Sequence, residues 1–161
     1  MTEKEACKKF VNCVNNEDLT GALEALKFIS TEYLNTQEPV DDYDMLIQVT
    51  VTGNPCAIKA LLMDGRCDWT HEENICGMQA REFAEPIPEF KQLFDENRPP
   101  DFIFRKGEII PKSEIHDRIY GGTLELDRGI FLLCDEAVRE NLIAAEKVTR
   151  EQAEAWLKPV Y

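Results

Sequence analysis

The sequence predicts a mostly α-helical protein in two parts: a stack of helix pairs over residues 1–97 and a small α+β module or cap over residues 98–161. In the first part, short apolar stripes at helical spacing alternate with glycine, asparagine and proline, which separate short helices. The stretch Asn97-Arg98-Pro99-Pro100 then marks a helix stop and a turn. Beyond it, two short apolar runs flank a glycine turn, which is the pattern of a β-hairpin.

The clearest helix pair lies between Asp44 and Asp68. Leu46 to Thr52 predicts one short helix, and Gly53 ends it because a left-handed residue there carries no Cβ penalty. Pro55 suits the first turn of the next helix, where its missing N–H removes no bond. The apolar stripe of that second helix consists of Ile58, Leu61 and Leu62. One pair cannot cover its own apolar face, so we expect further pairs beside it.

Weaker copies of this pair are predicted on both sides. Upstream, Ala6–Val14 and Leu19–Leu34 predict two helices, with the polar turn Asn15-Asn16-Glu17-Asp18 between them. Downstream, Gly77–Ala84 and Pro88–Phe94 predict another two. The first part of the chain is therefore expected to contain repeated helix pairs.

The spacing within the central pair resembles an ankyrin repeat, whose pattern is T-P-L-H-x-A-A-x-x-G-x-x-x-x-V-x-x-L-L-x-x-G-A-D. The positions that keep this order are Leu46, Val49, Gly53, Ile58, Leu61, Leu62, Gly65 and Asp68. Departures occur where Asp44-Met45 replaces Thr-Pro and Ile47 replaces His. The resemblance extends over residues 3–97 as about three degenerate repeats. It implies an ankyrin-like helical repeat array with projecting finger loops, a scaffold that binds proteins far more often than it catalyses.

The second part resembles no family that we recognise. It begins with a predicted hairpin about Arg105-Lys106-Gly107. The apolar runs Thr123–Leu126 and Ile130–Cys134 predict either another hairpin or a helix that starts near Asp127. The two helices that follow are predicted over Asp135–Lys147 and from the capping box Thr149-Arg150-Glu151-Gln152 to Pro159.

Negative charge is concentrated in the first part of the chain. The protein has 161 residues and a net charge of −13. Residues 1–97 hold 8 Lys and Arg against 19 Asp and Glu, a net charge of −11, whereas residues 98–161 carry −2. Such a field favours another protein with a basic surface as the partner, and it disfavours direct nucleic-acid binding and anionic membranes. The alternative is that the charge only keeps the protein soluble.

Composition favours a cytoplasmic globular protein. The hydrophobic share of 43% is ordinary for a globular chain. No apolar run reaches the roughly 18 residues of a membrane span, and the N-terminus lacks the apolar centre of a signal peptide. The six cysteines show no disulfide-rich spacing, so we expect reduced thiols and a cytoplasmic location.

Two acidic clusters, each with an aromatic residue, are predicted to form the partner-binding surface. The first cluster is Asp41, Asp42, Tyr43 and Asp44, and the second is Trp69, His71, Glu72 and Glu73. In an ankyrin-like array both would be finger loops that project on the same side. An aromatic residue beside carboxylates is typical of a binding hot spot with a charged rim. The alternative is loop solvation, with Tyr43 and Trp69 packing on their own repeats.

The sequence offers little for catalysis or cofactor binding. It contains no Gly-rich phosphate loop, H-E-x-x-H, G-x-S-x-G or C-x-x-C. Its only histidines are His71 and His116, and we expect His116 to be a solvated loop residue. Cys67, His71 and Cys76 fit no common zinc spacing. We therefore expect no catalytic residue, no cofactor and no metal site.

These observations predict a non-catalytic protein-binding module, an acidic inhibitor or antagonist that occludes a basic surface of its partner. Toxin-immunity proteins and viral antagonists of host proteins are of this type. One alternative is a small enzyme with its active site in residues 98–161 and the repeats as a substrate adaptor. Another is an ankyrin adaptor that joins two proteins. A pocket with convergent polar groups in the second part would favour the enzyme.

Overall fold

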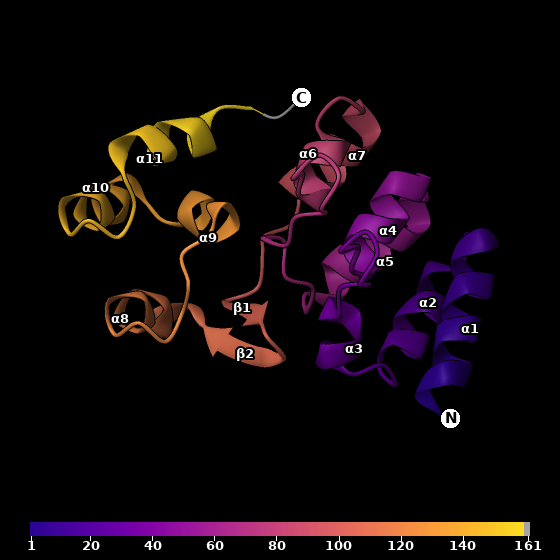
Figure 1. Ribbon diagram of the computed structural model, residues 1–161. Coiled ribbons are helices and arrows are strands. Elements are labelled where there is room, and N and C mark those ends of the chain that lie inside the picture. The colour runs from indigo at the N-terminus through magenta and orange to yellow at the C-terminus, as the bar shows by residue number, and fades with distance from the viewer. Residues whose placement is uncertain (160–161) are drawn as a thin grey trace.

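The computed structural model describes residues 1–159, which are mostly helical and include a two-stranded sheet. The elements of the N-terminal body are α1 (Glu3–Asn15), α2 (Leu19–Leu26), α3 (Thr31–Asn35), α4 (Met45–Thr52), α5 (Pro55–Asp64), α6 (Ala80–Ala84) and α7 (Pro88–Asp95). Those of the C-terminal body are β1 (Phe102–Arg105), β2 (Glu108–Pro111), η1 (Lys112–Glu114), α8 (Ile115–Tyr120), α9 (Arg128–Leu133), α10 (Glu136–Ala144) and α11 (Arg150–Leu157). Figure 1 shows the two bodies side by side, and each has its own apolar core.

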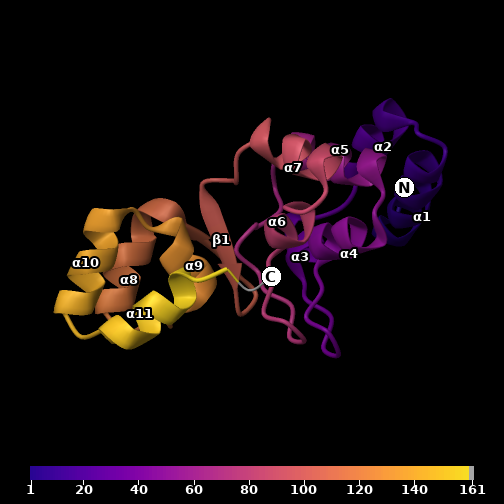
Figure 2. The same cartoon turned by 90° about the horizontal axis from the view of Figure 1, so that it is seen from above.

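Helix pairs are stacked along the N-terminal body: α1 with α2, α4 with α5, and α6 with α7. Helix α4 packs against α6, while α5 packs against both α2 and α7, so neighbouring pairs meet helix to helix in two layers (Figure 2). The predicted inward stripe is confirmed, because Leu61 and Leu62 are buried in the shared core. Within residues 3–95, the apolar face of each helix pair is thus covered by the neighbouring pairs.

The predicted glycine and proline positions at the central pair are confirmed. Gly53 and Gly65 end α4 and α5 with left-handed φ values of 78° and 80°. Pro55 occupies the first turn of α5, and the Asn54 side chain caps that helix. The single helix predicted over Leu19–Leu34 is wrong. Helix α2 ends at Leu26, and α3 begins where the Ser30 side chain accepts a hydrogen bond from the backbone of Tyr33.

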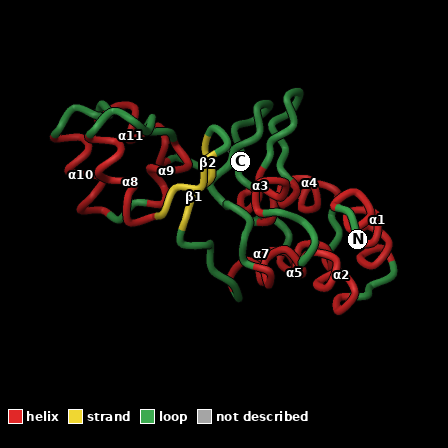
Figure 3. Tube along the Cα trace, turned by 90° about the horizontal axis from the view of Figure 1, so that it is seen from below, coloured by secondary structure: helices red, strands yellow, loops and turns green. Residues whose placement is uncertain are grey.

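Two long loops leave the helix layers in the same direction and run side by side (Figures 2 and 3). We call residues 36–44, between α3 and α4, the first finger, and residues 69–79, between α5 and α6, the second finger. They are tied to each other at several points. The Gln37 side chain donates to the carbonyl oxygens of both Asp42 and Glu72, at 2.8 and 3.2 Å. The backbone N–H of Asn74 donates to the carbonyl oxygen of Asp41 at 3.0 Å.

The C-terminal body begins with the predicted hairpin, which is confirmed. Strands β1 and β2 are antiparallel, and Lys106 and Gly107 form the turn with left-handed φ values of 51° and 76°. The helix alternative near Asp127 is correct and the second hairpin is wrong, because the Asp127 side chain caps α9 by accepting from the backbone of Ile130. The predicted last two helices are confirmed as α10 and α11.

The two bodies meet closely where α9 approaches the second finger. A Cβ atom on Gly129 would collide with the carbonyl oxygen of Thr70, so only glycine allows this approach. Among the described residues, no helix is long and apolar enough to cross a membrane.

Candidate functional site

The structure places the predicted binding residues in two different environments. Asp41, Asp42 and Tyr43 of the first finger are partly exposed, as is Glu72 of the second. The expected surface position is wrong for the other four side chains. Their exposed fractions are only 2% for Asp44, 8% for Trp69, 3% for His71 and 2% for Glu73. Each of these four has contacts within the fold that explain its position.

His71 bridges the bases of the two fingers and the C-terminal body. Its Nδ1 lies 2.7 Å from Asp44 Oδ2, and its Nε2 lies 2.7 Å from the carbonyl oxygen of Phe104. Nε2 is also 3.3 Å from Asp68 Oδ2. All three of these oxygens are acceptors, so both ring nitrogens must donate and the ring is held as an imidazolium.

The protonation of His71 reflects a balance between burial and nearby carboxylates. Burial disfavours the charged ring, but the hydrogen bond with Asp44 and the negative charge of Asp68 outweigh it. The pKa of His71 is therefore raised above its ordinary value of 6.5. His71 is a structural cation in the interior, and it is not available to a partner.

Asp68 joins the second finger to the hairpin of the C-terminal body. Its Oδ1 accepts from the backbone and the hydroxyl of Thr70, at 2.8 and 2.6 Å. Its Oδ2 accepts from the backbone N–H of Phe104 at 2.7 Å and from Arg105 Nη1 at 2.9 Å. Arg105 also forms an ion pair with Asp127, with 3.0 Å between its Nε and Asp127 Oδ2. We call Asp44, Asp68, His71 and Arg105 the buried polar network. Neither Asp68 nor Arg105 was identified from the sequence as a part of it.

Glu73 holds the tip of the second finger in shape. Its carboxylate accepts from the backbone N–H groups of Ile75, Cys76 and Met78, at 2.7, 2.8 and 3.1 Å. The neighbouring Asn74 side chain donates to the carbonyl oxygen of Val40 at 2.7 Å, which fastens the two tips together. This buried carboxylate is fully occupied by its own loop.

The joined tips display two aliphatic side chains to solvent. Val40 is 86% exposed and Ile75 is 76% exposed, more than any other large hydrophobic residue of the described chain. Isolated exposed apolar residues are common. Here, however, they sit on loops that are fixed by Glu73 and Asn74, so the exposure is built into the fold. Neither residue was identified from the sequence.

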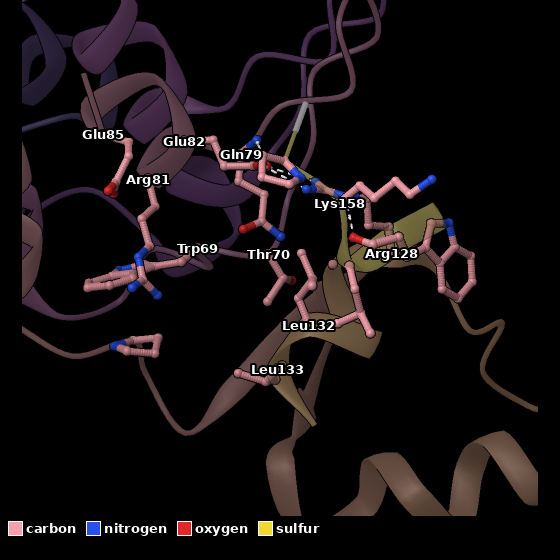
Figure 4. A pocket seen from close by; sticks show the side chains of 15 residues that line it. Trp69, Thr70, Gln79, Arg81, Glu82, Glu85, Arg128, Leu132, Leu133 and Lys158 are labelled. Carbon is pink, nitrogen blue, oxygen red and sulfur yellow. Dashed lines mark hydrogen bonds and ion pairs between the residues drawn. The ribbon is translucent and has the colours of Figure 1, made fainter. Parts of the chain in front are cut away.

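A cleft of about 420 Å³ lies where the second finger and α6 face α9 and α11 (Figure 4). Trp69 lines it at one end but belongs to the core, where its ring meets Phe94 edge to face at 5.0 Å. Arg128 crosses it and donates to Glu82 at 2.7 Å and Glu72 at 2.6 Å. Hydrogen bonds with Glu82 raise the pKa of Arg128, against the effect of burial. The charged groups that cross the cleft are thus paired with one another.

Two further reactive side chains, Cys67 and His116, lie outside the lining of this cleft. Burial raises the pKa of the Cys67 thiol well above its usual range, which keeps it a poor nucleophile. His116 is half-exposed, with Nδ1 3.5 Å from Asp117. No group of three or more His, Cys, Asp or Glu side chains within residues 1–159 is placed to hold a metal ion.

Comparisons with protein-family models, with curated proteins and with solved structures found no match for this chain.

Proposed function

We propose that residues 3–97 form a degenerate ankyrin-type array and that the protein is a non-catalytic binding module. Its role would be to occlude a basic surface of another protein. The stacked helix pairs, the left-handed glycines that close α4 and α5, and the two parallel fingers support the array. Scaffolds of this kind present loops and one helix layer as an extended contact surface.

The observation that carries the proposal is the pair of joined finger tips. Val40 and Ile75 stand exposed on loops that a buried carboxylate and a cross-finger amide hold in place. Pre-formed loops lose little conformational entropy on binding, so their apolar side chains contribute more of their burial to affinity. Asp41 and Asp42 lie beside Val40 and give the tips an acidic edge.

The charge of residues 1–97 supports a cationic partner. Residues 1–97 carry −11, which steers the array towards a cationic protein surface and repels nucleic acid. A partner whose basic surface binds nucleic acid would lose that surface on complex formation, so the protein would act as a cytoplasmic inhibitor. An adaptor, by contrast, would leave its partner active.

The test begins with purification of binding proteins from native cell extract at low and at high salt. The purified partner is then titrated with wild-type protein and with a Val40→Ser and Ile75→Ser double variant. We expect a salt-sensitive complex with a basic protein, and affinity about tenfold or more weaker for the double variant. The matched control is a Phe28→Ser and Met63→Ser double variant. Both side chains are 50% exposed, and both lie away from the fingers.

The same titration distinguishes an inhibitor, which occludes its partner, from an adaptor, which leaves its partner active. Loss of the partner's own activity at a one-to-one ratio supports an inhibitor, whereas unchanged activity in a saturated complex supports an adaptor. The proposed surface is wrong if the Val40→Ser and Ile75→Ser double variant forms the complex as well as wild type does and the contact maps to residues 98–161.

A further inference from the structure

A small groove opens beside the first finger, between α3 and α4. Its volume is about 270 Å³, below the roughly 300–1,000 Å³ of sites that hold drug-sized ligands. Tyr33, Tyr43 and Met45 supply aromatic and apolar surface, and Glu38 and Gln48 supply polar atoms. A groove of this size and lining suits one long side chain.

The tyrosines of this groove stand in a negative environment. Burial, followed by the charges of Glu73 and Asp41, raises the pKa of Tyr43. A hydrogen bond with Cys7 is the main reason that the pKa of Tyr33 is raised. The charge of Glu38 contributes in the same direction. Carboxylates on both sides thus disfavour a further negative charge and favour a positive one.

His71 pairs with Asp44 at the edge of this region, but no ion pair within the described residues reaches its other carboxylates. Glu38, Asp41 and Asp42 take part in none of the ion pairs formed within residues 1–159. Asp44 also lines the groove, but its two oxygens are occupied by the backbone of Ile47 and by His71. The free carboxylate in the lining is therefore that of Glu38.

We infer that the groove receives a lysine or arginine side chain of the partner protein. The aliphatic stem of such a side chain would lie along Met45 and the tyrosine rings, and its charged end would face Glu38. An uncharged apolar side chain would leave the carboxylate unpaired, and a phosphate or carboxylate ligand would be repelled. The inference rests on the proposed function and adds to it the chemistry of one contact.

The test uses blocked pentapeptides, with arginine, lysine or the neutral isostere citrulline between glycines, titrated into ¹⁵N-labelled protein. We expect the arginine and lysine peptides to shift the amide signals of Tyr33, Tyr43, Met45 and Gln48. The citrulline peptide should bind about tenfold more weakly, as loss of cation–π and charge contacts predicts. Equal binding of citrulline overturns the inference.

Variants show whether the arginine peptide binds in this groove. Tyr43→Ala and Glu38→Gln should each weaken arginine-peptide binding by about tenfold, whereas Tyr43→Phe should retain it because the ring remains. Glu89→Gln removes the same charge from an exposed position of α7 and should have no effect. The inference is wrong if the amide signals shift over all acidic surfaces and these variants do not change the shifts.

The two proposals fail in different ways. If Glu38→Gln and Tyr43→Ala leave peptide binding unchanged while the protein partner still depends on the finger tips, only the groove is wrong. If the groove binds the arginine peptide but no basic protein partner exists, the proposed function is wrong and the cation site stands.

Discussion

Both fingers are acidic, yet the carboxylates near their tips have different surroundings. In the first finger, Asp41 and Asp42 remain partly exposed and free of ion pairs within the described chain. In the second, Glu73 binds three backbone N–H groups of its own loop and Glu72 pairs with Arg128. An acidic loop can therefore offer a partner only those carboxylates that are not already paired inside the fold.

The largest test of this contrast is Asp68→Ala at the base of the second finger. Its removal leaves Arg105 buried without one of its carboxylates and frees the backbone of Phe104. We expect a loss of roughly 3–5 kcal/mol in the free energy of unfolding, measured by urea denaturation. Glu38→Ala in the first finger is the control and should leave the unfolding midpoint unchanged. If the free energy of unfolding of Asp68→Ala lies within about 0.5 kcal/mol of the wild-type value, the role assigned to Asp68 is wrong.

Glu73→Ala should loosen the second finger with a smaller effect on global stability. Three backbone donors lose their acceptor, which costs roughly 1–3 kcal/mol. Hydrogen exchange should become faster at the amides of Ile75, Cys76 and Met78. Asp42→Asn is the matched change in the first finger, since asparagine also tolerates the left-handed φ of 59° found there. Unchanged exchange at all three amides would show that the carboxylate does not hold the tip.

His71 makes stability depend on pH. Because its folded pKa is raised above 6.5, its stabilising contribution is fully present below pH 6.5 and is lost as pH rises through the folded pKa. Urea midpoints of the wild type should therefore fall relative to those of His71→Gln as the solution becomes alkaline. Nitrogen NMR should show both ring nitrogens protonated below pH 6.5. Parallel pH profiles for the two proteins would refute the imidazolium.

The smallest expected effect concerns the rate of association. Changing both Asp41 and Asp42 to Asn keeps the turn but removes two charges from the exposed finger. Association with the partner should slow a few-fold and become less sensitive to salt, because rim charges act mainly by steering. Tyr43→Ala should instead speed dissociation. Identical kinetics for the neutralised variant would mean that the acidity only maintains solubility. Asp44 and Trp69 are unsuitable for this test, because both are buried.

Local signals in the sequence predicted much of the fold. Gly53, Gly65 and Pro55 act through backbone geometry that depends on the residue itself, so their positions could be identified without tertiary contacts. The run that became α9 was ambiguous, because a short apolar segment fits a strand or a buried helix equally well. The turn between α2 and α3 was missed, since Ser30 is a weak signal within an otherwise continuous apolar stripe.

The candidate site was harder to predict, because its contacts join residues far apart in sequence. His71 and Asp44 are separated by 27 positions, and Asp68 and Arg105 by 37. Composition shows that a loop is acidic, but it does not show which carboxylate meets a buried donor. The high exposure of Val40 and Ile75 was equally hidden, because it follows from the positions of Glu73 and Asn74 in the folded fingers.

The outer edge of β1 has a consequence for solubility. At Phe104, the backbone N–H donates to Asp68 and the carbonyl oxygen accepts from His71. Two side chains therefore take the place that a third strand would occupy. An unpaired strand edge invites another chain to extend the sheet, which is a common start of aggregation. Asp68 and His71 thus cover the β1 edge of the hairpin and oppose edge-to-edge association there.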